Sequence, residues 1–175
     1  MKIILYFILC LYIIISYANA TVKEYTVNNK TDLNQLITNV QHEQDSDVII
    51  YFEDEYYDMS SLDIYTIEFT VDTNIKLIGR KQGTTFNYNN LRKGVMKILF
   101  NNIKGKKFTI ENIIFENFYG HNVFNLFIES YTFDFYFELN NCTFRNNESP
   151  IISFIKYYSN SLISHENIIF NNCNF

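Results

Sequence analysis

The sequence predicts an all-β fold in which short strands coil into a repeating solenoid. Many short apolar strand patterns alternate with Asn-rich turns, an Asn-x-x-Phe-x-Asn motif recurs, and only one amphipathic helix is convincing. The 175 residues are 47% apolar and carry a net charge of only −5. This composition excludes a disordered chain and fits a single domain.

Residues 1–20 predict a secretory signal peptide. Lys2 precedes an apolar run over 3–15, and the segment closes on the small-x-small pattern of Ala18 and Ala20. The run is short for a membrane span of about 20 residues, so an uncleaved anchor is the alternative. We expect a secreted or extracellular protein with no membrane span once the signal is removed.

Three glycosylation sequons fit the secretory route. They begin at Asn29, Asn141 and Asn147, and Pro150 follows the last one and should weaken it. Sequons also arise by chance in an Asn-rich chain, so each is modest support for secretion.

The segment 21–46 predicts an N-terminal strand and an amphipathic helix. Residues 23–27 have a strand pattern, and Thr31-Asp32 offers an N-cap for a helix at about 32–41. Leu33, Leu36, Ile37 and Val40 fall on one face of this helix. The strands that we expect after it cover 47–52, 64–71, 74–79, 84–88, 95–100, 107–110, 113–115, 123–129, 133–139, 142–144, 151–156, 162–163 and 168–170.

The repeat is clearest in three segments, at 110–118, 139–147 and 165–173, whose starts are 29 and 26 residues apart. Stacked coils would bring equivalent positions to about 4.8 Å from one another. We expect an inner ladder of apolar residues made by Ile113, Phe115, Cys142, Phe144, Ile168 and Phe170. We also expect a turn ladder, since Asn tolerates the left-handed conformation, made by Asn117, Asn146 and Asn172.

The same frame bears on the two cysteines that would remain after signal removal. It places Cys142 in the inner ladder and Cys173 at a turn. Because the two are then out of register, we expect no disulfide between them.

The frame at 139–147 resembles coils of right-handed parallel β-helix proteins, the pectin-lyase-like superfold. A strand, a helix, then VIIYFEDEYYDM at 48–59 and NIKLIG at 74–79 also resemble the way such solenoids begin. The resemblance implies a right-handed parallel β-helix over 47–175 with its N-terminal end capped by the helix. An antiparallel β-sandwich is the alternative. Because the chain ends directly after a repeat copy, we expect a truncated product, a fragment, or a subunit that a partner caps.

Charge is unevenly distributed along the chain. Ten acids and no base lie between Glu43 and Asp72, and nine bases and no acid lie between Lys76 and Lys107. The dense acids at 53–58 fit either a Ca²⁺ site or a solvated turn. The basic block fits either an acidic polysaccharide or pairing with acids of neighbouring coils, which we favour. The signal peptide argues against nucleic acid as a partner.

No catalytic motif stands out. His121 follows Gly120, but the other segments that the polygalacturonase branch of this superfold requires are missing. Asp134, Glu138 and Arg145 are too sparse to indicate a lyase site. Tyr136 is a candidate sugar-stacking residue, opposite a core face formed by Tyr131, Phe133, Phe135 and Phe137. Core packing that leaves one exposed Tyr is the alternative, which we favour. We therefore assign no catalytic residues, no metal and no cofactor.

The expected function is a secreted or cell-surface β-helix protein that binds glycans or partner proteins without catalysis. One alternative is a polysaccharide lyase or glycoside hydrolase of the pectin-active type. Another is a structural fragment without a ligand.

Overall fold

The computed structural model describes residues 21–41, 43, 46–120, 124–157 and 167–175. The three histidines and the expected strand at 162–163 lie outside these residues, as does the expected signal peptide at 1–20.

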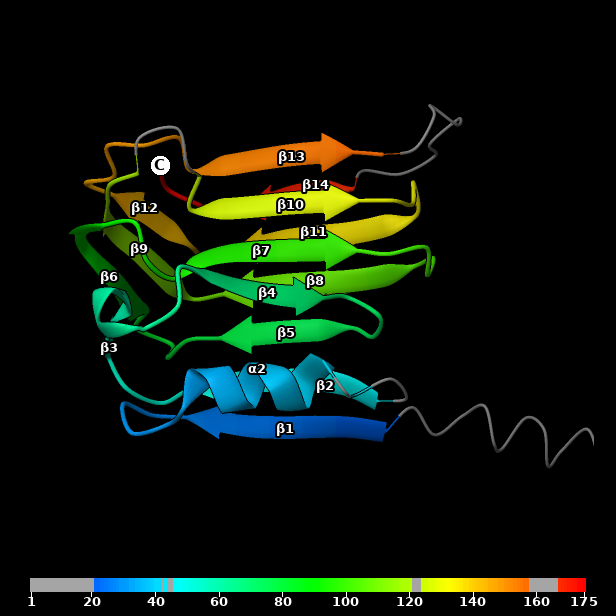
Figure 1. Cartoon of the computed structure of the whole chain (residues 1–175), viewed down its shortest axis with the longest axis horizontal. Coiled ribbons are helices and arrows are strands. Elements are labelled where there is room, and N and C mark those ends of the chain that lie inside the picture. The colour runs from blue at the N-terminus through cyan, green and yellow to red at the C-terminus, as the bar shows by residue number, and fades with distance from the viewer. Residues whose placement is uncertain (1–20, 42, 44–45, 121–123, 158–166) are drawn as a thin grey trace, which may run out of the picture.

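The chain forms three parallel sheets that it visits in turn, one strand of each per coil (Figure 1). Sheet A contains β1 (Thr21–Val27), β2 (Ser46–Phe52), β5 (Ile75–Ile78), β8 (Lys106–Glu111), β11 (Phe135–Asn140) and β14 (Ile168–Asn171). Sheet B contains β3 (Tyr56–Asp58), β6 (Thr84–Leu91), β9 (Ile113–Phe118) and β12 (Thr143–Arg145). Sheet C contains β4 (Thr66–Thr70), β7 (Val95–Phe100), β10 (Leu126–Ser130) and β13 (Ile152–Lys156).

The coil is right-handed. In Figure 1 the chain passes from sheet A at the back, through sheet B at the left, to sheet C at the front as it climbs. Every strand pairing in the described residues is parallel, from β1 with β2 to β11 with β14. The structure thus confirms the predicted right-handed parallel β-helix, and the antiparallel sandwich is wrong.

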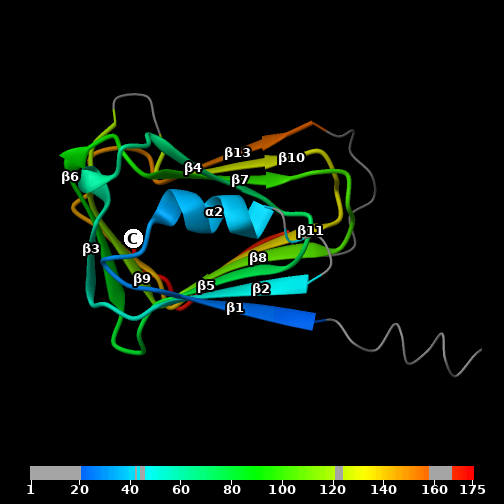
Figure 2. The same cartoon turned by 60° about the horizontal axis from the view of Figure 1, so that its bottom comes forward.

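The helix α2 (Leu33–Gln41) covers the N-terminal end of the coil stack (Figure 2). Asp32 accepts a hydrogen bond from the backbone N–H of Gln35 at 3.2 Å, as an N-cap residue does. Leu36 and Val40 are buried in the core, so the apolar face of the helix closes the interior. A short 3-10 helix, η1 (Met59–Ser61), links β3 to β4.

The segment at 53–58 is more than the acidic turn expected from its composition. Its last three residues form β3, in which Tyr57 is buried against Phe52 and Phe86. The Tyr57 hydroxyl donates to the carbonyl of Val27 at 2.7 Å, and burial raises the pKa of Tyr57. A buried ring thus explains why a strand forms beside so many carboxylates.

The inner ladder requires a correction in its last copy. Phe115 and Phe144 stack in sheet B, with ring centroids 4.8 Å apart and planes 5° apart. The next ring on this stack is Phe175, 5.1 Å from Phe144, whereas Phe170 lies in sheet A beside Leu139.

The sequence motif also places Ile168 wrongly, because it assigns its third copy to the wrong sheet. It lies beside Phe137 in sheet A, and its expected place after Ile113 and Cys142 belongs to Cys173. Both cysteines are free thiols, but the argument from register was wrong, because Cys173 follows Cys142 in the ladder.

Two columns of left-handed Asn residues mark the corners of the coils. Asn117 and Asn146 form one column, with φ of 57° and 55°. Asn172, with φ of 52°, belongs instead to a second column with Asn112 and Asn141. In this second column each amide donates to the one before it at 3.3 Å, over 29 and 31 residues of chain. These amides are exposed, so the Asn pairing is external and not internal.

Candidate functional site

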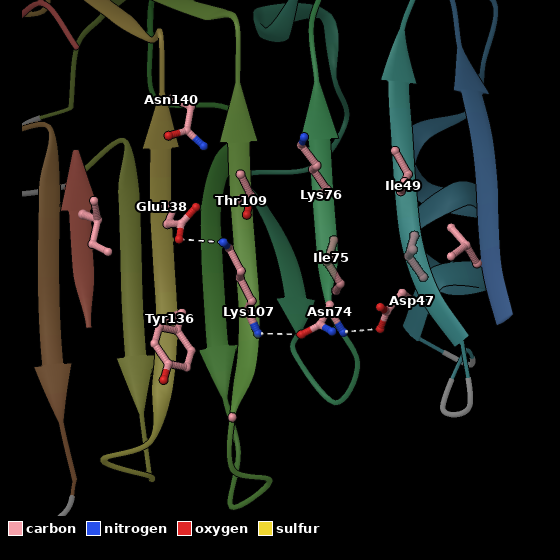
Figure 3. Close-up of a pocket in the computed structure, with 14 residues that line it drawn as sticks. Asp47, Ile49, Asn74, Ile75, Lys76, Lys107, Thr109, Tyr136, Glu138 and Asn140 are labelled. Atoms are coloured by element: carbon pink, nitrogen blue, oxygen red, sulfur yellow. Dashed lines mark hydrogen bonds and ion pairs between the residues drawn. The ribbon is translucent and has the colours of Figure 1, made fainter. Parts of the chain in front are cut away.

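The outer face of sheet A is hollowed into a shallow groove that crosses its strands from Val22 on β1 to Ile169 on β14. Its volume is about 690 Å³, and we call it the sheet A groove. Most of its polar lining is drawn in Figure 3 and comprises Asp47, Asn74, Lys76, Lys107, Thr109, Tyr136, Glu138 and Asn140.

Strand alternation explains why these side chains face outward. On β2, for example, Val48 and Ile50 are buried while Ile49 between them is only half-buried. Because the strands are parallel and in register, outward residues form rows across the coils. One row consists of Ile49, Lys76, Thr109 and Glu138. In the next row Lys107 lies beside Tyr136.

Two ion pairs bridge neighbouring strands of this face. Lys107 Nζ lies 2.6 Å from Glu138 Oε1, and Lys76 Nζ lies 2.6 Å from Glu111 Oε2. The side chains of Lys107 and Glu138 are 43% and 17% exposed, so the pair stands at the surface. Thr109, in register between Lys76 and Glu138, is only 5% exposed and lies at the floor of the groove.

Asn74 ties the lower rim of the groove together (Figure 3). Its side-chain oxygen accepts from the backbone N–H of Lys107 at 3.0 Å. Its own backbone N–H donates to Asp47 Oδ1 at 3.3 Å. These bonds hold the strand ends in register, so the rim is fixed before any ligand arrives.

The groove offers a ring, amides, a hydroxyl and apolar side chains rather than an acid–base pair. Of the carboxylates that line it, Glu138 is paired with Lys107, and Asp47 accepts from the backbone of Asn74. Within the described residues, no three His, Cys, Asp or Glu side chains converge as a metal site would require. The arrangement fits recognition of a polar ligand with apolar faces.

Three residues of the acidic turn, Asp54, Glu55 and Asp58, are engaged by nearby groups, and one of these contacts is an ion pair with the basic block. Asp54 accepts from the backbone N–H of Asn29 at 2.6 Å, and Glu55 pairs with Arg80 at 3.1 Å. Asp58 caps η1 by accepting from the N–H of Ser60.

Sheet C repeats this pattern of pairing. Lys97 lies between Glu68, at 3.3 Å, and Glu129, at 3.4 Å. Together with the two pairs of sheet A, this supports the expectation that neighbouring coils pair acid with base. Among the described residues, the acids at 53–58 do not form a cluster that could hold Ca²⁺.

The sequons differ in how their side chains are engaged. Asn29 is exposed in the turn after β1. Asn141 is exposed but belongs to the external Asn column. Asn147 is half-buried, and its amide donates to the Phe115 carbonyl at 3.1 Å and accepts from the Phe118 N–H at 2.9 Å. Of the three, Asn29 offers the amide that a glycan reaches without breaking a coil contact.

The remaining sequence candidates do not gather into a site. His42, His121 and His165 lie outside the described residues. Arg145 pairs with Glu116 at 2.6 Å in sheet B, away from the groove that Glu138 lines.

The aromatic run before and within β11 also needs a correction. The strand begins at Phe135, and only Phe135 and Phe137 are core residues. Tyr131 is 45% exposed and stacks on Tyr157, while Phe133 lies under the ammonium group of Lys104 at 5.0 Å. Tyr136 lines the sheet A groove from the outer face of β11, opposite the core residues.

Comparison with known protein families, with curated proteins and with solved structures found no match for the chain. Within the described part of the chain, the structure has no helix that is long and apolar enough to cross a membrane.

Sequence reasoning found Tyr136 and Glu138 but missed most of the groove. Asp47, Asn74, Lys76 and Lys107 come from three different coils. The sequence does carry a sign of these four residues, because each stands next to an apolar strand residue and therefore points outward. To see that they lie side by side, one must know the register of the coils, and the sequence motif assigns that register wrongly at its third copy.

Proposed function

We propose that the protein is a secreted or cell-surface β-helix protein of the pectin-lyase-like type, and that its sheet A groove binds glycans without catalysis. One observation carries the proposal: a groove of about 690 Å³ combines the ring of Tyr136 with amide, hydroxyl and apolar groups on one rigid sheet. Sugars present apolar C–H faces and polar hydroxyl edges, and such a lining can meet both.

Sequence features support the location and the superfold. The pattern at 1–20 and the sequon of exposed Asn29 are what a secreted glycoprotein would carry. The parallel coils with Asn at their corners support the likeness to pectin-lyase-like proteins.

The contacts of the groove carboxylates support binding over catalysis. A glycoside hydrolase needs two carboxylic groups flanking the scissile bond, one of them with a raised pKa. Here Glu138 is held by Lys107 at 2.6 Å, and Asp47 is held by a backbone N–H at 3.3 Å. Both carboxylates are thus already engaged by groups of the protein itself, which supports a binding role.

The test uses the protein secreted from cells that express the full chain. It is passed over immobilised plant and microbial polysaccharides, and the same mixtures are assayed for reducing ends and unsaturated products, with and without Ca²⁺. We expect retention without turnover. Tyr136→Ala should abolish retention, while Tyr65→Ala, which removes a ring that is 66% exposed outside the groove, should retain it.

Each other outcome has a clear meaning. Turnover that Tyr136→Ala or Glu138→Gln abolishes would replace binding with lyase or hydrolase activity. Neither retention nor turnover on any polysaccharide would contradict the proposal and favour a partner protein or a purely structural role.

A further inference from the structure

We infer that the sheet A groove selects an extended, uncharged glycan and rejects polyuronate chains. The inference rests on the proposed function and adds the chemical class of the ligand. It follows from the charge, the surface chemistry and the length of the groove.

The charge of the groove is already balanced from within. Its two lysines, Lys76 and Lys107, each contact a glutamate oxygen at 2.6 Å. Glu138 and Asp47 line the groove and Glu111 lies beside it, so three carboxylates accompany the two ammonium groups and a small negative excess remains. A uronate would have to displace Glu111 or Glu138 from its lysine and would meet the excess charge. An uncharged sugar meets neither obstacle.

The surface between the ion pairs suits a sugar ring. Ile49, Ile169 and Val22 give the outer face an apolar component, and Val22 is 52% exposed. Tyr136 contributes an aromatic face of the kind on which apolar ligand surfaces pack. Asn140 lies at the upper end of the same strand, where its amide already accepts from Asn171 at 2.8 Å, so its orientation is set.

The length of the groove favours a chain over a single sugar. The lining extends from β1 to β14, across all six strands of sheet A. At about 4.8 Å per strand this is roughly 24 Å, the length of several sugar rings in a row. The ligand would therefore lie along the solenoid axis, across the coils.

Two further bases, Lys104 and Lys106, flank Gly105 at the rim, and no ion pair joins either of them to a carboxylate of the described residues. Lys104 is placed over the ring of Phe133 at 5.0 Å. Gly105 donates its N–H to the carbonyl of Asp134 at 2.8 Å, which brings a further acidic residue to this corner. The corner is therefore mixed in charge as well.

Calorimetric titration of the secreted protein with a matched pair of ligands tests the inference. Hexagalacturonate and its fully methyl-esterified form share one backbone and differ in charge, and cellohexaose and mannohexaose are added as uncharged chains of other geometry. We expect at least one uncharged hexasaccharide to bind about tenfold more tightly than hexagalacturonate. That affinity should change less than about twofold between low and high sodium chloride. The matching disaccharide should bind about tenfold more weakly.

Two variants separate the charge argument from unfolding. Glu138→Gln frees Lys107, so affinity for hexagalacturonate should rise about fivefold at low salt. Glu68→Gln removes one of the two carboxylates beside Lys97 on sheet C, outside the groove, and should leave all affinities unchanged. Thermal melting by circular dichroism checks that both variants stay folded.

The outcomes distinguish the two proposals. Preference for hexagalacturonate, with affinity that falls steeply with salt or is lost in Lys106→Gln, would overturn the inference and leave glycan binding standing. Binding of none of the glycans would overturn the proposed function together with the inference.

Discussion

Removing one ring from the aromatic stack of sheet B should destabilise the protein far more than removing the residue that the sequence motif equates with it. Phe115 has no exposed surface. It stacks on Phe144 at 4.8 Å and meets the edge of Phe86 at 5.8 Å. Phe115→Ala leaves a cavity between coils that the neighbouring backbone cannot fill. We expect a loss of about 3–5 kcal/mol in the free energy of unfolding.

Phe170 provides the matched control. It occupies the equivalent place in the Asn-x-x-Phe-x-Asn motif, but it lies in sheet A and is 44% exposed. Because roughly half of its surface remains in water, Phe170→Ala should cost only about 1 kcal/mol. Phe175→Ala removes the ring that does continue the stack, but this ring is 61% exposed and its loss should cost about as little.

Urea unfolding of the three variants, followed by far-ultraviolet circular dichroism and tyrosine fluorescence, measures these differences. Equal losses for Phe115→Ala and Phe170→Ala would refute the register of the last coil. A loss below about 1 kcal/mol for Phe115→Ala would refute the stacked interior itself.

Four further predictions follow from the contacts. Asn117→Ala should cost about 1 kcal/mol in urea unfolding while Asn117→Gly stays within about 0.5 kcal/mol, since only the alanine resists a φ of 57°; equal losses would contradict this. In the native protein iodoacetamide should label half-buried Cys173 but not buried Cys142, whose pKa burial raises to about 12, and mass spectrometry showing Cys142 labelled first would be the contrary result. Burial lowers the pKa of Lys97, but its two glutamate partners raise it more, to a net value above the ordinary 10.5. The stabilisation by charged Lys97 is therefore complete below pH 10.5 and is lost at higher pH. The difference in unfolding free energy between the wild type and Lys97→Met should shrink only above that pH, and a difference that grows there would contradict the prediction. Glycopeptide mapping after secretion from eukaryotic cells should find a glycan at Asn29 and none at the other two sequons, and an occupied second or third sequon with an empty first would contradict the contacts.

The fold could be predicted because local and long-range signals agree. The face of Leu33, Leu36, Ile37 and Val40 fits a helix with one side on a core, and α2 buries that side. Asn at the corners relieves the strain of left-handed turns, and Asn117 and Asn146 adopt them.

The register of the third copy could not be predicted, for a physical reason. Each coil has two corners that accept Asn, so a short Asn-and-Phe motif can match either corner. What decides between them is packing: Phe175 on Phe144 and Asn172 on Asn141. These contacts depend on how many residues separate a strand of sheet C from the next strand of sheet A. That number differs from coil to coil.

The site was only partly predictable for the same reason. Tyr136 and Glu138 stand out on one strand, because alternation alone sets them outward. The pairs of Lys107 with Glu138 and of Lys76 with Glu111 join successive coils. Pairing of acid with base between adjacent coils was expected, but Glu111 and Glu138 lie outside the acidic block, so these partners required the register.

Binding of a glycan on the outer face of sheet A can be located residue by residue. The experiment is amide chemical-shift mapping of the isotope-labelled, secreted protein, with the uncharged hexasaccharide that binds most tightly as the ligand. We predict the largest shifts in β5, β8 and β11, centred on Lys76, Thr109 and Tyr136, with little change in β4, β7 and β10. Shifts centred on β4, β7 and β10 instead, or no shifts at saturating ligand, would contradict the account.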